Sequence, residues 1–172
     1  MGRFKYIASL ILGVLLSTNL PAGAQTAPIG KPMVYVFLQA KCPCIYEHKD
    51  TFRKIIRTYG DKANIKAVFV GPQDSPESAQ DLLRQLNWDV EYLIDKTHRY
   101  VRMYNPSVST DVVVANGSGK VYYKGAIDDG YKNMGMVKNF FLDRVLKAYI
   151  EGNPVPFSGT SGGGCTIMPI KK

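Results

Sequence analysis

The sequence FLQAKCPCIYEH, residues 37–48, joins the end of an apolar run to two cysteines that flank a single proline. The apolar run begins with MVYV at residues 33–36, and its β-branched and aromatic side chains are typical of a strand buried on both faces. After the cysteines, apolar residues recur on one helical face as far as Gly60, which favours a helix end. The stretch therefore predicts a strand, a loop that carries Cys42 and Cys44, and a helix.

The rest of the chain continues the alternation of strands and helices. Further strands are expected at residues 65–70, 90–94, 111–115 and 120–127, and helices at residues 45–59, 76–86, 96–104 and 134–150. Ser75 before Pro76 is a strong helix start, and the turn Asn116-Gly117 is typical of a hairpin. The alternation indicates parallel crossovers, so we expect an α/β fold with a central mixed sheet of about five strands flanked by helices.

Residues 1–24 have the pattern of a secretory signal peptide. Arg3 and Lys5 precede an apolar run at residues 7–16, and the small residues at 22–24 fit a cleavage site. The alternative is an uncleaved membrane anchor, but a run of about 10 residues is short of the roughly 20 that span a bilayer. We therefore expect a cleaved signal, no stable membrane insertion and a periplasmic or secreted protein.

Behind the signal, the sequence predicts a folded domain at residues 25–152 and a tail at residues 153–172. The tail is rich in Gly, Ser and Pro and has no periodicity, so we expect it to lie along the surface or to move, yet it carries Cys165. The formal net charge of +8 comes from scattered basic residues, without a dense basic run interleaved with aromatic side chains. This is the pattern of a solvated surface, and we expect no nucleic-acid partner.

The three cysteines allow at most one disulfide within the chain, unless a metal ion takes all three thiols. Cys42 falls in the loop before the expected helix, and Cys44 at or just before its start. Unpaired N–H groups at a helix N-terminus favour a thiolate, and Lys41 acts in the same direction, so Cys42 is the expected nucleophile. A bridge between Cys42 and Cys44 closes a very tight ring and should be easily reduced. Cys165, on the tail, can reach either.

Three motifs carry a resemblance to the thioredoxin-like superfamily, and more narrowly to its exported, peroxiredoxin-related redoxin branch. They are FLQAKCPC at residues 37–44, VYYKGAIDDGY at residues 121–131 and GCTI at residues 164–167. The resemblance extends over residues 33–168 and agrees with the order of the expected elements. It implies a thioredoxin-like fold and a thiol-dependent oxidoreductase, whose partner is a protein thiol or disulfide or a small peroxide.

The sequence departs from both standard active-site motifs of this superfamily. Thioredoxin-type oxidoreductases resemble C-x-x-C, but Ile45 stands at the last position; peroxiredoxins resemble T-x-x-C, but Gln39 stands at the first. The cis-proline that usually precedes the fourth strand has no counterpart at Ser109-Thr110. Because that proline shields the thiols from metal ions, its absence leaves the site more open to a metal.

These residues support three interpretations. In the first, Cys42 attacks a disulfide or peroxide, and Cys44 or Cys165 resolves the intermediate without a cofactor. In the second, Cys42, Cys44 and His48, with or without Cys165, bind copper or zinc for metal delivery, because soft ions prefer thiolates. A lone histidine on a basic amphipathic helix, as expected for His48, is however more typical of a surface residue than of a metal ligand. In the third, a structural disulfide made with Cys165 fixes the tail, and the domain only binds a partner.

Overall fold

The computed structural model describes residues 30–133 and 136–168. The expected signal peptide at residues 1–24 lies outside the described residues, as do the last four residues of the predicted tail. Within the described ranges, no helix has the length and apolar character that crossing a membrane requires.

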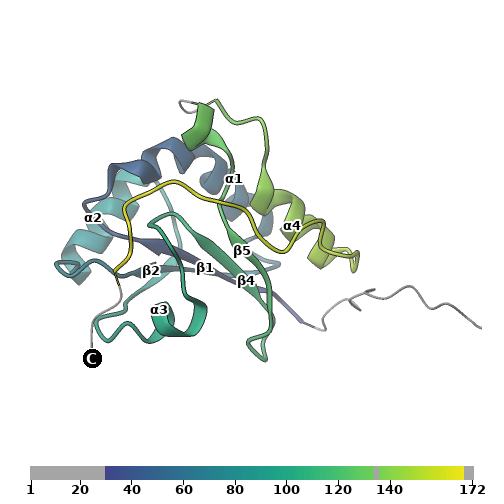
Figure 1. Cartoon of the computed structure of the whole chain (residues 1–172), viewed down its shortest axis with the longest axis horizontal. Helices are drawn as coiled ribbons and strands as arrows, with labels where there is room; N and C mark the ends of the chain where they lie inside the picture. Colours follow the sequence, from purple (N-terminus) through teal and green to yellow (C-terminus); the bar gives the residue numbers. More distant parts are fainter. Residues whose placement is uncertain (1–29, 134–135, 169–172) are drawn as a thin grey trace, which may run out of the picture.

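A five-stranded mixed sheet forms the centre of the molecule, as predicted (Figure 1). Its strands are β1 (Met33–Leu38), β2 (Asn64–Phe69), β3 (Glu91–Ile94), β4 (Val112–Ala115) and β5 (Val121–Gly125). They lie in the order β3-β2-β1-β4-β5. β1, β2 and β3 are parallel, whereas β4 runs antiparallel to both β1 and β5. The sequence order therefore reverses beside β1, and this is the place in an open α/β sheet where a crevice forms at the strand ends.

The composition of β1 explains its central position. Val34, Val36 and Leu38 belong to the apolar cluster on one face of the sheet, and Tyr35 and Phe37 to the cluster on the other. Successive side chains of a strand point to opposite faces, so a strand covered on both sides needs apolar residues at every position. The continuous apolar run meets this requirement.

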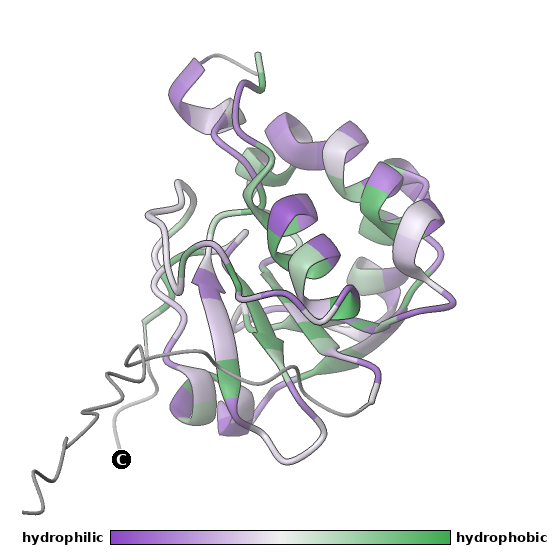
Figure 2. Cartoon of the chain, turned by 90° about the vertical axis from the view of Figure 1, so that its right-hand side faces the viewer, coloured by the Kyte–Doolittle hydropathy of each residue, from purple (hydrophilic) through white to green (hydrophobic). Residues whose placement is uncertain are grey.

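Helices cover both faces of the sheet (Figure 1). α1 (Lys49–Tyr59), α2 (Pro76–Leu86) and α4 (Phe141–Ile150) pack on one face, and α3 (Arg99–Tyr104) on the other. α2 begins at the predicted cap, where the side chains of Ser75 and Ser78 each accept a hydrogen bond from the other's backbone N–H. Figure 2 shows apolar residues along the strands and polar residues on the outer sides of the helices, as burial of one helix face requires.

The predicted helix at residues 45–59 is divided into two parts. A 3-10 helix, η1 (Pro43–His48), comes first, and α1 begins only at Lys49. The buried residues of η1 and its cap are Cys42, Ile45 and His48. Side chains three apart are eclipsed in a 3-10 helix, so this spacing places all three on the inner face.

The last helix is shorter than predicted, because α4 begins at Phe141. A second 3-10 helix, η2 (Gly130–Asn133), occupies the region before it, and residues 136–140 are not helical. The carboxylate of Asp129 accepts hydrogen bonds from the backbone N–H groups of Lys138 and Asn139. These donors serve a side chain instead of a helical turn, which explains the late start.

The described part of the tail runs back along the domain, from the end of α4 across the molecule (yellow in Figure 1). Gly159 pairs with Lys124 of β5 in a parallel bridge. Further on, a Cβ atom at Gly163 would overlap the ring of Tyr131. Glycine permits this close approach, so the glycine run fits the tail to the domain instead of loosening it.

Candidate functional site

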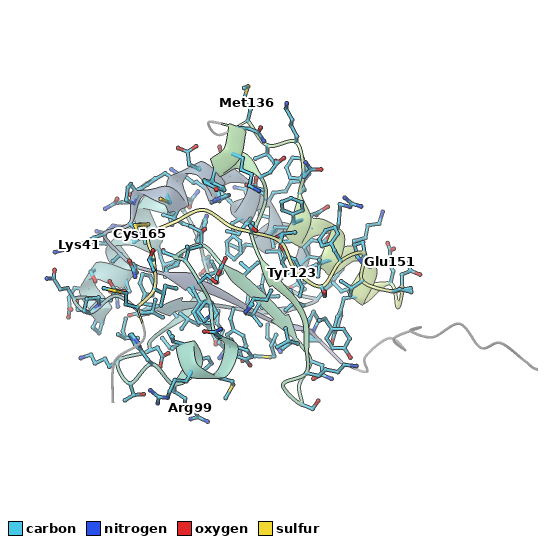
Figure 3. All side chains as sticks on the ribbon, in the orientation of Figure 1. Lys41, Arg99, Tyr123, Met136, Glu151 and Cys165 are labelled. Atoms are coloured by element: carbon cyan, nitrogen blue, oxygen red, sulfur yellow. A yellow bond between two sulfur atoms is a disulfide. The ribbon has the colours of Figure 1, made fainter. Side chains whose placement is uncertain are left out.

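All three cysteines meet beyond the carboxyl end of β1. Cys42 forms a disulfide with Cys165, and the Cα atoms of the two residues are 6.0 Å apart. The Cys44 thiol is free. The three Sγ atoms lie within 4.8 Å of one another. Figure 3 labels Cys165 on the tail, which brings it to the loop between β1 and η1. The structure thus brings together the three cysteines singled out from the sequence.

Cys42 is held at the start of η1. It is the N-cap residue, its backbone is extended, and its N–H donates to the carbonyl of Gln39 over 2.9 Å. The residue is 3% exposed. Because the following six-residue helix is of the 3-10 type and α1 starts at Lys49, neither Cys42 nor Cys44 stands at the N-terminus of an α-helix. The helix-dipole argument for a thiolate at Cys42 is therefore not supported by this geometry.

Cys44 lies on the outer side of η1. It is half-buried and, with Pro43, Glu47 and Tyr131, lines an open pocket of about 410 Å³. Cys44 is thus the cysteine of the cluster that lines a surface pocket.

Lys41, the basic residue beside the cysteines, binds elsewhere: its ammonium group donates to Oε1 of Gln73 over 2.7 Å.

Backbone hydrogen bonds fix Cys165 beside Cys42. The N–H of Ser109 donates to the carbonyl of Cys165 over 2.8 Å, and the N–H of Ile167 donates to the carbonyl of Ser107 over 3.1 Å. The N–H of Cys165 itself lies 3.3 Å from the Cys42 Sγ. The tail therefore adds an antiparallel segment beside the loop that precedes β4.

That loop contains the position where a cis-proline was absent from the sequence. No peptide bond in the described ranges is cis. Thr110 has φ of 92°, a conformation that costs a β-branched residue free energy. Its hydroxyl donates to the carbonyl of Gly163 over 2.9 Å, and the hydroxyl oxygen of Ser109 accepts from the N–H of Gln39 over 3.1 Å. Ser109 and Thr110 thus connect β1 to the tail.

His48 lies in the interior, and the expectation of a surface position is wrong. Its Nδ1 lies 2.5 Å from Oδ1 of Asp128, and the two side chains are 1% and 0% exposed. The same oxygen accepts the N–H of Gly130 over 2.8 Å. Neither Nε2 of His48 nor Oδ2 of Asp128 has a hydrogen-bond partner in the part of the chain that the structure describes. The pair connects η1 to the segment before η2.

This pair changes the alternative ligand set. His48 is not part of the cluster of ligand atoms that the three cysteines form among the described residues. Asp128, which belongs to the motif VYYKGAIDDGY, is the buried partner of His48. The pairing was missed because 80 residues separate the two. The available signal was the spacing of three from Cys42 through Ile45 to His48, which is that of a buried face.

The sequence left open whether the tail lies along the surface or moves, and the structure places its described part against the domain. Adding a Cβ at Gly162 would crowd the Asp111 carboxylate, and one at Gly164 would overlap the carbonyl oxygen of Ser109. A glycine run directly before a cysteine is the signal that could have indicated close backbone approach.

The tail also contacts β5 through Thr160. The hydroxyl of Thr160 is 2.6 Å from that of Tyr123, and burial raises the pKa of the Tyr123 phenol, so the phenol stays neutral.

A larger cavity of about 710 Å³ lies at the carboxyl ends of β1, β2 and β3. Gln39 and Val70, which directly follow β1 and β2, contribute to its wall, and Thr166 and Met168 contribute from the tail. The side-chain amide of Gln39 donates to the carbonyl of Thr166 over 3.3 Å, which joins the two walls. The cavity therefore adjoins the segment that carries Cys165.

Comparison with known proteins places the fold. No protein-family model matches the sequence, and no curated protein is significantly similar to it. Among solved structures, an uncharacterized conserved protein from Geobacillus kaustophilus has a TM-score of 0.70 and 24% identity, covering 84% of this chain and 78% of its own. A hypothetical protein from Sinorhizobium meliloti has a TM-score of 0.69 and 19% identity, covering 84% and 81%.

A third similar structure is described as thioredoxin-like. A thioredoxin-like protein determined in its oxidized form has a TM-score of 0.57 and 16% identity, covering 72% of this chain and 80% of its own. These identities establish similarity of the fold alone. The sheet order and these similarities show that the chain has a thioredoxin-like fold.

Proposed function

We propose that this protein is an exported thiol–disulfide redox protein that uses Cys42 as its nucleophile and Cys165 as its resolving thiol. The observation that carries the proposal is the disulfide between these residues, with the free thiol of Cys44 beside it. The signal pattern at residues 1–24 supports export, and disulfides persist in oxidising compartments outside the cytosol. The thioredoxin-like fold supports the same class of chemistry.

The proposed reaction transfers two electrons between the cysteine pair and a partner. In the reduced protein, the Cys42 thiolate attacks one sulfur of a partner disulfide; a mixed disulfide forms, and the other partner sulfur leaves as a thiolate. The Cys165 thiolate then attacks the Cys42 sulfur and releases the partner as a dithiol. The protein is oxidised to the Cys42–Cys165 disulfide, and the partner is reduced. The reverse sequence, with a dithiol partner, restores the thiols.

The test is turnover of a model disulfide peptide and, separately, of hydrogen peroxide, with a dithiol as reductant. Cys42→Ser should abolish turnover, and Cys165→Ser should accumulate a mixed disulfide at Cys42 that mass spectrometry detects. Met103→Ser replaces an exposed sulfur on α3 and is the control that should keep full turnover. Turnover of peroxide alone would make peroxide the substrate. Full activity of Cys42→Ser with both substrates would contradict the proposal.

The geometry of the sulfur cluster supports metal binding as a second candidate function. When all three cysteines are reduced, their thiolates, within 4.8 Å of one another, form a soft donor set suited to Cu(I) or zinc. The ligands would be Cys42, Cys44 and Cys165, without His48. A metal held there would occupy the thiols that the redox reaction needs, so metal delivery and disulfide exchange would compete.

Metal binding is tested on the reduced protein. Dialysis against Cu(I) or zinc, followed by elemental analysis, should give about one ion per chain if the cluster is a metal site. Replacing both Cys42 and Cys44 by serine should abolish retention. Retention that survives this double replacement would place the metal elsewhere and remove the cluster from consideration.

A further inference from the structure

The free thiol of Cys44 lies beside the disulfide, on the side that opens to the surface. Its Sγ is within 4.8 Å of both bonded sulfur atoms. The residue is half-buried and lines the pocket of about 410 Å³, whereas Cys42 is 3% exposed. The cluster therefore places a half-buried thiol at a surface pocket, against a disulfide that joins buried Cys42 to half-buried Cys165.

We infer that Cys44 is an exchange thiol that moves the disulfide from Cys42 to itself, an inference that rests on the proposed redox function. The Cys44 thiol loses its proton to water, and its thiolate attacks the Cys165 sulfur. The Cys44–Cys165 bond forms, the Cys42–Cys165 bond breaks, and Cys42 leaves as a thiolate. One disulfide and one thiol are present before and after the step, so no electrons enter or leave the protein.

Chain geometry favours Cys165 as the sulfur that is attacked. A bond from Cys44 to Cys42 would join residues two apart and close a very tight ring. Cys165 instead comes from a separate segment, held beside the loop by the hydrogen bond from the Ser109 N–H to its carbonyl. A bond from Cys44 to Cys165 joins two segments that already lie side by side, and thus needs the smaller change in backbone.

Exchange gives the oxidised protein two forms with different accessibility. In the first, the disulfide includes buried Cys42, and Cys44 is the free thiol. In the second, the bond lies at the pocket lined by Pro43 and Tyr131, and Cys42 is free. A dithiol partner that re-reduces the protein therefore meets the disulfide at the pocket of Cys44, where the surface is open.

The experiment is a labelling study of the oxidised wild-type protein alone. Incubation at about pH 8, near the ordinary pKa of a thiol, leaves time for exchange. Acid then stops the exchange, and alkylation of the acid-unfolded protein by a maleimide captures a free Cys42 as readily as a free Cys44. Digestion without reductant and mass spectrometry then identify the labelled cysteine. Exchange predicts label on both Cys44 and Cys42, with the matching Cys42–Cys165 and Cys44–Cys165 peptides. Label confined to Cys44 at every time point would overturn the inference.

Two variants make the result unambiguous. Cys42→Ser should not turn over the substrates of the redox assay, but a strong chemical oxidant such as diamide should close a Cys44–Cys165 disulfide in it. Failure to form this bond in the folded variant would also overturn the inference. Cys44→Ser should show no label, and a dithiol protein should reduce it at least tenfold more slowly than it reduces wild type. The two proposals fail differently: labelling of Cys42 without turnover contradicts the redox function, whereas turnover with label on Cys44 alone contradicts only the exchange.

Discussion

The side chain of Cys42 is almost fully buried, although its proposed chemistry requires contact with a partner. The tail contributes to this burial, because Cys165 lies directly against it and is held by Ser109. A partner sulfur can approach Cys42 only after this part of the tail has moved. In the proposed cycle, Cys42 is therefore uncovered only when its bond to Cys165 is broken and the tail has moved.

Asp128→Ala should destabilise the protein, because it leaves Nδ1 of His48 and the N–H of Gly130 without their acceptor. Loss of one partner in a buried hydrogen bond costs roughly 1–3 kcal/mol, so the free energy of unfolding should fall by at least about 2 kcal/mol. Urea unfolding measures the loss. The control is Asp81→Ala, which removes an exposed pair with Arg84 and should cost less than about 1 kcal/mol. Equal losses would contradict the expectation.

Gly164→Ala should disfavour the Cys42–Cys165 disulfide, because a Cβ atom there overlaps the Ser109 carbonyl oxygen. Overpacking costs about 1–3 kcal/mol, so the equilibrium constant for closing the bond should fall by roughly 5- to 150-fold. Mass mapping in a glutathione redox buffer measures this constant. Gly117→Ala is the control, since a Cβ there meets no atom within 4 Å. An unchanged constant for Gly164→Ala would show that the tail accommodates the methyl group.

Among the elements, the segment between β5 and α4 is shaped in part by the carboxylate of Asp129. Asp129 accepts the backbone N–H groups of Lys138 and Asn139, and the Asn139 side-chain amide donates to its other oxygen over 2.7 Å. Burial alone would raise the pKa of Asp129, but these hydrogen bonds outweigh it and lower the pKa to about 2. The ionised form is thus the one that shapes the segment.

The pH dependence of stability follows from this lowered pKa. Since the carboxyl of Asp129 has a pKa near 3.8 in the unfolded chain and about 2 in the folded one, its contribution to the free energy of unfolding is complete only above about pH 5. It is lost as the pH falls through about 2. The difference in unfolding free energy between wild type and Asp129→Asn should therefore be constant above about pH 5 and shrink between pH 4 and 2. Parallel stability curves over that window would contradict the assignment.

The strands and α2 could be predicted because their signals are local. The apolar run of β1 and the Ser75 cap lie within the elements that they define. The burial of His48 could not be predicted, since its partner is 80 residues away. Likewise, the sequence left the partner of Cys42 open between Cys44 and Cys165, because the choice depends on where a tail without periodicity comes to lie. The predicted start of the last helix was wrong because the carboxylate of Asp129, which lies before that helix in the sequence, accepts the backbone N–H groups that the first helical turns would use.

For the molecule as a whole, the disulfide connects the loop after the central strand β1 to the tail, and thereby closes a long covalent ring. Its cysteines are 123 residues apart. In the chain-entropy account, a ring of this length stabilises the folded state by about 4–5 kcal/mol through restriction of the unfolded chain. The oxidised protein should accordingly be much more stable than the reduced one.

Cys165→Ser provides the test of this whole-molecule effect. In guanidinium unfolding without reductant, the variant should be about 3–5 kcal/mol less stable than oxidised wild type. With reductant present, the two should differ by less than about 1 kcal/mol, because the ring is then open in both. Equal stability without reductant would mean that the bond adds nothing to the fold beyond the packing of the tail.

The position of the two bonded cysteines also sets an order of events during synthesis. Cys42 and Cys44 leave the ribosome early, whereas Cys165 follows Cys42 by 123 residues. At a typical 5–20 residues per second, the nascent chain spends roughly 6–25 s with two adjacent thiols and without their partner. The bond seen in the structure can therefore form only after Cys165 has been synthesised. Until then, the pair is exposed to other oxidants, to metal ions and to foreign thiols.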